Sequence, residues 1–377
     1  MNINFFINDT TLREGEQFHT ACFNTDDKIR IAELLCSFGI PYIELSSPAV
    51  SLGTQRDIIT LKKRRLPAKI ATHIRCHNED IRKACDCGVD SIHIYYKLPH
   101  GILLKDLCSS IKKVTDEISE KISIARQNLP TAEIRFSIED IFRFDIDAAL
   151  LIYKALEATG LITRFCVSDT SGTALPDQIK TIFNIFKMAV NTPLGFHGHN
   201  DIGLAAANTL CALQNGARFI DVSVLGIGER TGITPLESLI AILYSIDKED
   251  IRKKYRLQNL AKLSNTVASI IRKKIPFNIP ITSKTAFTHK AGVHSASLLR
   301  NEKYYEALNP EDFSRRHSLL YAHKLTGKHA VNQFCKKNNI PLNAAQCAQA
   351  LAIIKDLADQ KKLNRKNFRW VLLDCSK

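Results

Sequence analysis

Eight short apolar segments, rich in β-branched residues, alternate with longer segments of helical period between residue 1 and about residue 250. This alternation is typical of βα units arranged around a parallel sheet. Strands are predicted at 3–9, 41–47, 69–75, 91–96, 132–138, 162–168, 194–198 and 219–225. Eight consecutive units favour a closed barrel. We therefore predict an α/β fold, a (β/α)8 TIM barrel over residues 1–255, followed by a small helical C-terminal region.

The helical segments show a clear apolar stripe. In the segment from Asp27 to Phe38, which follows the cap-like Thr25, the stripe consists of Ile29, Ile31, Leu34 and Leu35. After about residue 255 the strand pattern stops. We expect a helical linker or lid subdomain at 256–330, contributing to a partner's active site, and a small C-terminal helical subdomain at 331–377.

Charge and composition exclude several classes of protein. The 52 Lys and Arg residues against 38 Asp and Glu give a formal net charge of +14, which suits anionic partners. The basic residues are scattered through predicted helices, so we expect no nucleic-acid partner. The chain has no run of 18 apolar residues, its N-terminus leaves no room for a signal peptide, and its 11 cysteines form no disulfide or CxxC framework. We predict a cytoplasmic protein without a membrane partner.

Polar residues follow nearly every predicted strand. A TIM barrel carries its chemistry at the C-terminal ends of its strands, so these side chains should meet at one mouth. In chain order they are Asp9, Arg13, Glu14, Gln17, Glu44, His73, Arg75, His77, Arg135, Ser137, Glu139, Asp169, Thr170, His197, His199, Gly226, Gly228, Glu229 and Arg230. An open doubly wound sheet would not concentrate polar groups in this way, and no GxGxxG motif follows the first strand.

The clearest candidate for a metal site is the pair His197 and His199. Side chains at i and i+2 of a strand point to the same face, here the barrel mouth. Two imidazoles and one carboxylate form a site for a divalent cation with open positions for substrate, and Glu14 is the third ligand we expect. The alternative is that the two histidines are simply packed or hydrogen-bonded within the barrel.

Such a cation would chelate the 1-carboxylate and 2-keto oxygen of an oxo acid. Arg13 would neutralise charge on that oxygen. Arg135 and Ser137 share one face of their strand and, with His73, would form a fork for a second, distal carboxylate. The alternative for Arg135 is a structural salt bridge within the barrel. The segment from Gly226 to Gly232 either lets the backbone approach a ligand or merely closes the barrel.

Six segments in order resemble homocitrate synthases of the isopropylmalate-synthase superfamily, and together they span nearly the whole chain. They are DTTLREGEQF (9–18), THIRCH (72–77), IRFSIED (134–140), HGHNDIGLAAAN (197–208), IDVSVLGIGERTGITPL (220–236) and TAFTHKAGVH (285–294).

The resemblance implies roles for particular positions. Glu14, His197 and His199 match the family's metal ligands, and Arg13 matches the arginine beside the oxo group. Substrate-binding positions that match are Arg13, Gln17, His73, Arg135, Ser137 and Thr170, and the catalytic positions are Arg13, Glu139, His294 and Tyr305. His294 and Tyr305 match a pair that the family delivers into the neighbouring subunit's barrel. The resemblance thus implies a homodimer in which this pair acts in trans.

The activity implied by the resemblance is a Claisen condensation of acetyl-CoA with 2-oxoglutarate to give homocitrate and CoA. It implies a divalent metal (Zn, Mn or Mg), acetyl-CoA as co-substrate and a place in lysine biosynthesis. Arg135 favours 2-oxoglutarate because the branched-chain synthases of this superfamily generally lack an arginine there.

Three alternatives stay open. The first is a 2-isopropylmalate or citramalate synthase, and it gains support from His93, where homocitrate synthases usually have an acidic residue in the substrate pocket. The altered stretch from Tyr95 to Lys105 also departs from the family. A lyase on the same barrel fits less well, because TAFTHKAGVH and Tyr305 belong to the condensing branch. The most distant alternative is a non-catalytic basic binding protein, although the metal-ligand set is intact.

Overall fold

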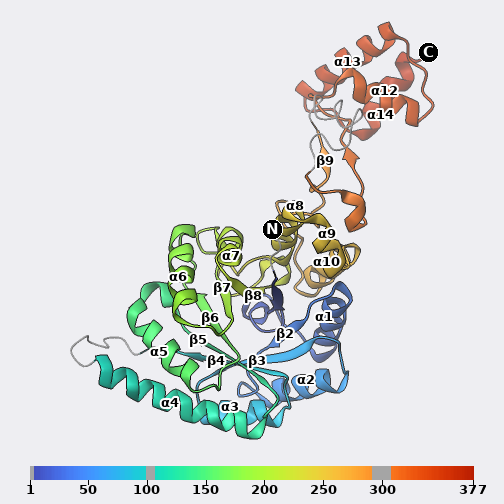
Figure 1. Ribbon diagram of the computed structural model, residues 1–377. Helices are drawn as coiled ribbons and strands as arrows, with labels where there is room; N and C mark the ends of the chain where they lie inside the picture. Colours follow the sequence, from blue (N-terminus) through green and yellow to red (C-terminus); the bar gives the residue numbers. More distant parts are fainter. Residues whose placement is uncertain (1–3, 99–106, 291–306) are drawn as a thin grey trace. The chain divides into compact units, whose positions relative to one another are not determined.

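Eight parallel strands close into a barrel in the computed structural model, which describes residues 4–98, 107–290 and 307–377 (Figure 1). The strands are β1 Phe6–Asp9, β2 Tyr42–Leu45, β3 Lys69–Arg75, β4 Ser91–Tyr96, β5 Glu133–Ile138, β6 Arg164–Asp169, β7 Leu194–Gly198 and β8 Ala217–Val222. Each strand pairs with its neighbours in sequence, and β1 closes the ring by pairing with β8. The predicted (β/α)8 barrel is therefore confirmed.

Helices connect the strands on the outside. In the barrel unit they are α1 Thr25–Phe38, α2 Leu52–Lys63, α3 Asn78–Asp86, α4 Leu107–Asn128, α5 Ile146–Ala158, α6 Pro176–Ala189, α7 Ala205–Gln214, α8 Leu236–Ile246, α9 Lys248–Lys254 and α10 Leu260–Ile270. Helix α1 starts at Thr25, two residues before the predicted segment, so its cap lies one residue earlier than predicted. Its cap is Asn24, whose side chain accepts from the Asp27 amide in a capping box, and Thr25 is the first helical residue.

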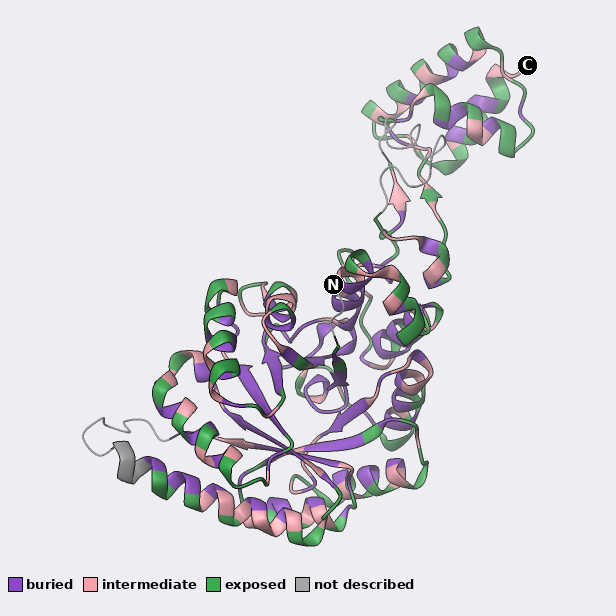
Figure 2. Ribbon diagram, in the orientation of Figure 1, coloured by how far each residue is buried: buried purple, intermediate pink, exposed green. Residues whose placement is uncertain are grey.

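The barrel core is formed by the strands and the inner faces of the helices. Figure 2 shows strands that are almost wholly buried and helices that are exposed on their outer faces. The last strand ends three residues before the predicted 225. Val224–Gly226 turns sharply instead, with Leu225 at φ 61°, because the chain must leave the sheet to form the loop over the barrel mouth.

The chain divides into two compact units, residues 1–275 and 276–377. The first includes α10, which contacts α1. The second contains two short paired strands, β9 Thr288–His289 and β10 Ser318–Leu319, and three helices among its described residues, α12 Lys328–Lys337, α13 Ala344–Asp359 and α14 Arg365–Cys375. Its core is apolar and includes Val331, Ile354 and Phe368.

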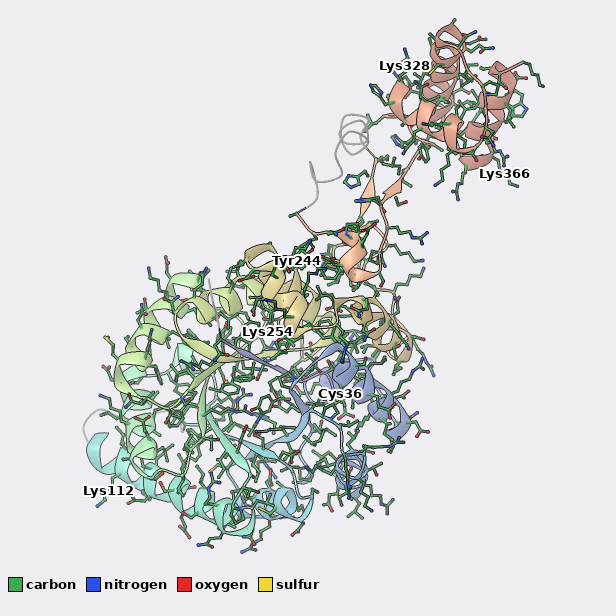
Figure 3. The ribbon with its side chains drawn as sticks, turned by 45° about the vertical axis from the view of Figure 1, so that its right-hand side comes forward. Cys36, Lys112, Tyr244, Lys254, Lys328 and Lys366 are labelled. Carbon is green, nitrogen blue, oxygen red and sulfur yellow. The ribbon has the colours of Figure 1, made fainter. Side chains whose placement is uncertain are left out.

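Basic residues are dispersed over many elements. Figure 3 labels Lys112 on α4, Lys254 on α9, Lys328 on α12 and Lys366 on α14. The cysteines whose side chains the structure describes are free thiols. None of the described helices is long and apolar enough to cross a membrane.

Candidate active site

One cavity of about 240 Å³ lies at the C-terminal ends of the barrel strands. Its lining contains every barrel residue to which the sequence analysis gave a catalytic, substrate-binding or metal-binding role. These are Arg13, Glu14, Gln17, His73, Arg135, Ser137, Glu139, Thr170, His197 and His199. Residues from most of the strands thus meet at one point, as the placement of active sites in this fold requires. His294 and Tyr305 lie outside the described residues.

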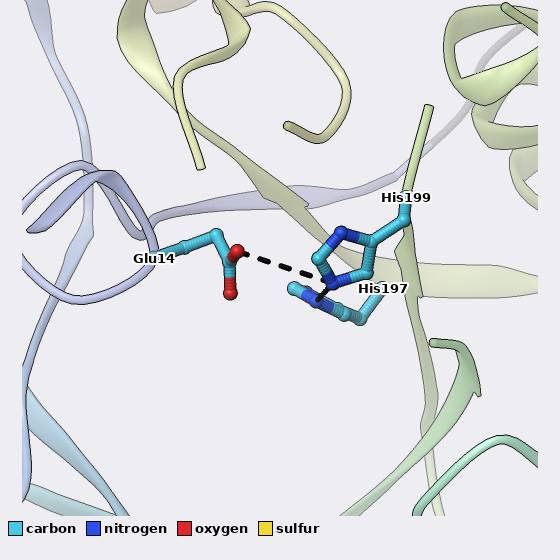
Figure 4. Close-up of side chains that lie close together, drawn as sticks. All are labelled: Glu14, His197 and His199. Atoms are coloured by element: carbon cyan, nitrogen blue, oxygen red, sulfur yellow. Dashed lines mark hydrogen bonds and ion pairs between the residues drawn. The ribbon is translucent and has the colours of Figure 1, made fainter. Parts of the chain in front are cut away.

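Glu14, His197 and His199 form a compact group of possible metal ligands (Figure 4). One ligand atom from each lies within 4.8 Å of the others. Nε2 of His197 and Nε2 of His199 are 3.4 Å apart, and the latter is 3.9 Å from Oε1 of Glu14. All three side chains are buried. Two imidazole nitrogens and a carboxylate oxygen that converge in this way match the donor set of a divalent cation.

The hydrogen bonding of His197 and the protonation of His199 also suit a metal. Nδ1 of His197 donates to the Asp221 carboxylate at 3.0 Å, so its Nε2 carries the lone pair that faces His199. Burial, followed by the nearness of His197, lowers the pKa of His199 to about 4, and its ring is therefore neutral at physiological pH. Neutral imidazoles are the form that binds metals. The residues present therefore fit a divalent cation.

Arg13 is held beside Glu14 by two carboxylates. Its Nη1 pairs with Glu14, and its Nε donates to Oε1 of Glu44 at 2.6 Å. Burial would lower the pKa of Arg13, but the charges of Glu44 and Glu14 outweigh burial and raise it. The guanidinium is thus fixed and fully charged at the edge of the metal group.

His93 lies between two strands that carry cavity residues, but it is absent from the described residues that line the cavity. The side chain is buried, pairs through Nδ1 with Glu44, and accepts at Nε2 from Arg164 at 2.5 Å. Burial lowers its pKa to about 4, despite the opposing effect of Glu44. Where the resemblance implies an acidic pocket residue, this chain therefore has a neutral imidazole that pairs with Glu44.

Arg135 forms a bidentate ion pair with Asp221, with distances of 2.8 and 2.6 Å. Burial alone would lower the pKa of Arg135, but the Asp221 carboxylate raises it well above the ordinary value. The salt bridge considered as the alternative reading is therefore present. The two readings are compatible, because the same guanidinium also lines the cavity.

The glycine-rich segment after β8 is shaped by its own packing. A Cβ on Gly232 would lie 1.8 Å from the Gly226 carbonyl oxygen, and one on Gly228 would lie 2.8 Å from Oε1 of Glu14. The amide of Glu229 donates to that same oxygen at 2.8 Å. The segment therefore closes the barrel and fixes a metal-ligand candidate, which accounts for both glycines without a bound cofactor.

Several residues of the site were given no specific role in the sequence analysis. Tyr95, Ser168, Glu229 and Arg230 also line the cavity. Asp221 and Glu44 are buried, do not line the cavity, and orient its charged groups. The sequence analysis did place three of these residues among the polar side chains at strand ends, namely Glu44, Glu229 and Arg230. That placement was the signal that they belong to the site. Asp221 lies in a quoted segment as a carboxylate within a strand, a signal that was not used, whereas Tyr95 sits in an ordinary strand pattern and gave none.

The barrel and the candidate metal site at its mouth place the protein among the metal-dependent enzymes of the HMGL-like class. Residues 4–267 match the family model described as HMGL-like, and residues 281–362 match the model described as homocitrate synthase post-HMGL domain-like. Solved hydroxymethylglutaryl-CoA lyases share the fold. The lyase of Bacillus subtilis has a TM-score of 0.60 at 21% identity, and that of Pseudomonas aeruginosa has a TM-score of 0.61 at 20% identity. Each match covers 75% of this chain, together with 97% of the first lyase chain and 96% of the second.

Full-length relatives narrow the class to one family. The mitochondrial homocitrate synthase of Schizosaccharomyces pombe is 41% identical over 96% of this chain and 85% of its own length. The cytosolic isozyme of Saccharomyces cerevisiae is 40% identical, with coverages of 96% and 84%, and the homocitrate synthase of Saccharolobus islandicus is 34% identical, with coverages of 92% and 75%. The chain belongs to the homocitrate synthase family.

Proposed function

We propose that this protein is a metal-dependent acyltransferase that condenses acetyl-CoA with 2-oxoglutarate to give homocitrate and CoA. One observation carries the proposal. A single cavity combines a Glu-His-His group with Arg13 and Arg135, in a chain that shares 41% identity with a homocitrate synthase over nearly its whole length. The cavity is smaller than the about 300–1,000 Å³ of typical drug-sized sites, and this size suits a small acid.

Glu14, His197 and His199 would hold the cation, and Zn²⁺, Mn²⁺ or Mg²⁺ is the ion we expect. When bound, the cation supplies Lewis-acid polarisation of the keto group. The protein's own part is to orient the ligands. Asp221 fixes the tautomer of His197, and the Glu229 amide fixes the Glu14 carboxylate.

Arg13 would stabilise the negative charge that develops on the keto oxygen during attack. Because Glu44 and Glu14 hold its guanidinium in place before the reaction, little reorganisation is needed when that charge appears. Gln17 lies in the same loop and lines the cavity, where it would contact the acceptor.

The distal carboxylate of 2-oxoglutarate would bind on the β3, β5 and β6 side of the cavity. Arg135, Ser137, His73 and Thr170 all line it there. The Thr170 hydroxyl accepts from the Asp140 amide at 2.9 Å, which leaves its proton for a ligand. Because Asp221 already pairs with Arg135, the arginine would share its charge between that carboxylate and the substrate.

The condensation needs a base for the acetyl methyl group. A proton leaves that carbon, the resulting enolate carbon attacks the keto carbon, and hydrolysis of the thioester releases CoA. Glu139 lines the cavity and is one candidate acid or base. His294 and Tyr305 complete the proposal, acting in trans within a homodimer. A cytoplasmic location and a role in lysine biosynthesis remain predictions, since relatives are named both mitochondrial and cytosolic.

The pairing of Arg135 with Asp221 supports one alternative, a synthase for a monocarboxylate acceptor such as 2-oxoisovalerate or pyruvate. Mass spectrometry of the product distinguishes the two. Purified protein given acetyl-CoA and equal amounts of 2-oxoglutarate, 2-oxoisovalerate and pyruvate should form homocitrate as the main product. Isopropylmalate or citramalate as the main product would replace the proposal with its alternative.

A further inference from the structure

Tyr95, at the end of β4, stacks on His73 of the neighbouring strand β3. The ring centroids are 4.8 Å apart and the ring planes differ by 11°. Residues 93 and 95 of β4 both point into the barrel, whereas Tyr96 points outward and donates to Glu117 of α4. Tyr95 therefore forms the next layer above the buried His93. Its ring is partly buried at the barrel mouth.

Two cavities meet at this stack. The cavity of about 240 Å³ contains the metal-ligand group, and a second cavity of about 710 Å³ lies toward the loop after β2. Both are lined by Arg13, Gln17, His73 and Tyr95. The second cavity is also lined by Arg75, the register partner of Tyr95, which Asp80 holds in a bidentate pair at 2.9 and 2.8 Å. The stacked rings of Tyr95 and His73 are thus part of the boundary, here called the wall, between the cavity of about 240 Å³ and the cavity of about 710 Å³.

The wall lies beside the position assigned to the distal carboxylate. Strand β4 lies between β3 and β5. Tyr95 of β4 is in register with Ser137 of β5, and His93 of β4 is in register with His73 of β3. Burial, followed by the charge of Arg13, lowers the pKa of His73 well below its ordinary value, so its ring is neutral. A neutral imidazole can bind a carboxylate only through its N–H group, and its orientation therefore decides whether it binds.

We propose that Tyr95 is a specificity-determining residue. Its ring fixes the orientation of His73 and closes the small cavity, so that the acceptor is limited to the length of 2-oxoglutarate. This inference rests on the proposed function. Without the ring, the two cavities join, and a 2-oxo diacid with one more methylene group, 2-oxoadipate, gains room to extend beyond His73.

The test compares kcat/KM for 2-oxoglutarate and 2-oxoadipate in Tyr95→Phe, Tyr95→Leu and Tyr95→Ala. One methylene group in a shaped pocket changes discrimination by roughly 10–200-fold, so Tyr95→Ala should shift the ratio toward 2-oxoadipate by at least about ten-fold. Tyr95→Phe keeps the ring and should stay close to the wild-type ratio. Tyr95→Leu should fall between them, and it tests the proposal even if the alanine variant does not fold.

Tyr96→Ala is the matched control, because it removes the same side chain from the outer face of the same strand. It should lower the melting temperature but leave the acceptor ratio unchanged. The inference fails if active Tyr95→Leu and Tyr95→Ala keep the wild-type ratio, or if Tyr96→Ala shifts it equally. Failure of the proposed function looks different, because the wild-type protein would then release no CoA with either diacid.

Discussion

Asp221 accepts a hydrogen bond from Nδ1 of His197 at 3.0 Å through Oδ2, the same oxygen that pairs with Arg135 at 2.6 Å. One buried carboxylate therefore orients both a candidate metal ligand and the candidate distal-carboxylate arginine. The carboxylate is anionic because Arg135 and His197 outweigh the effect of burial and lower the pKa of Asp221. The two halves of the site are thus coupled through one side chain.

Asp221→Asn should weaken divalent-metal affinity about 10- to 100-fold, the usual effect of losing a partner that orients a ligating histidine. Equilibrium dialysis of Zn²⁺ or Mn²⁺ against the folded variant measures this. Asp90→Asn is the control, because Asp90 pairs with Lys62 and the Ile70 amide, away from the cavity residues. Unchanged affinity in Asp221→Asn would mean that Asp221 serves only the Arg135 pair.

Gly228→Ala should reduce metal affinity and kcat together. The added Cβ would lie 2.8 Å from Oε1 and 2.9 Å from Cγ of Glu14, so the ligand must move. Metal titration and steady-state kinetics measure the two effects. Gly53→Ala is the matched control, because its Cβ meets nothing closer than 3.4 Å and lies in α2, where alanine is favoured by about 1 kcal/mol. Wild-type metal affinity in Gly228→Ala would contradict the assigned role of Glu14.

Arg135→Lys should lose more kcat/KM with 2-oxoglutarate than with 2-oxoisovalerate, since lysine keeps the charge but cannot bind carboxylates in bidentate geometry. Lysine is preferable to alanine, because removing one partner of a buried ion pair costs roughly 3–5 kcal/mol of stability. Acceptor kinetics alongside a thermal melt separate the two effects. An equal loss with both acceptors would leave Arg135 as a structural partner of Asp221.

Asp9 should make folding stability depend on pH. Burial raises its pKa to about 7, and its Oδ2 has no hydrogen-bond partner among the described residues. The folded state then keeps a proton that the unfolded chain releases near pH 4. The free energy of unfolding therefore falls by up to about 4 kcal/mol as the pH rises from about 4 to about 7, and it levels off at higher pH. Urea unfolding with EDTA at pH 5 and pH 8 measures the part of this loss that falls above pH 5, about 3 kcal/mol. The Asp9→Asn variant should lose less stability than the wild-type protein between these two pH values. An identical loss in the two proteins would show that Asp9 does not carry the raised pKa.

The barrel and most of its mouth were predictable because they follow from local rules. Strand period places His197 and His199 on one face, and parallel strands bring their C-terminal ends together, so residues as distant as Glu14 and His199 meet. The supporting residues were not predictable in this way. Asp221 looks like one more residue of β8, and its role appears only when the ring closes and brings β8 beside β7 and β1.

His93 shows a second limit of sequence reasoning. Its match to a pocket position of the family suggested a residue at the cavity, but its ring is buried against Glu44 and Arg164 and does not line the cavity. Tyr95, two residues further, takes the position at the cavity instead. The register partners of His93 are His73 and Arg135, and both line the cavity, so strand register alone does not exclude His93 from it. The His93 ring is instead taken up by Glu44 and Arg164, two residues that are distant in sequence.

The most direct test of the central claim is thiol release from acetyl-CoA with 2-oxoglutarate, 2-oxoisovalerate, pyruvate and oxaloacetate, each with EDTA and with added Zn²⁺, Mn²⁺ or Mg²⁺. We predict turnover that requires metal, is fastest with 2-oxoglutarate, and is lost in the folded Glu14→Ala and His199→Ala variants. Metal-independent release, or no release with any acceptor from the metal-loaded wild-type protein, would contradict the account.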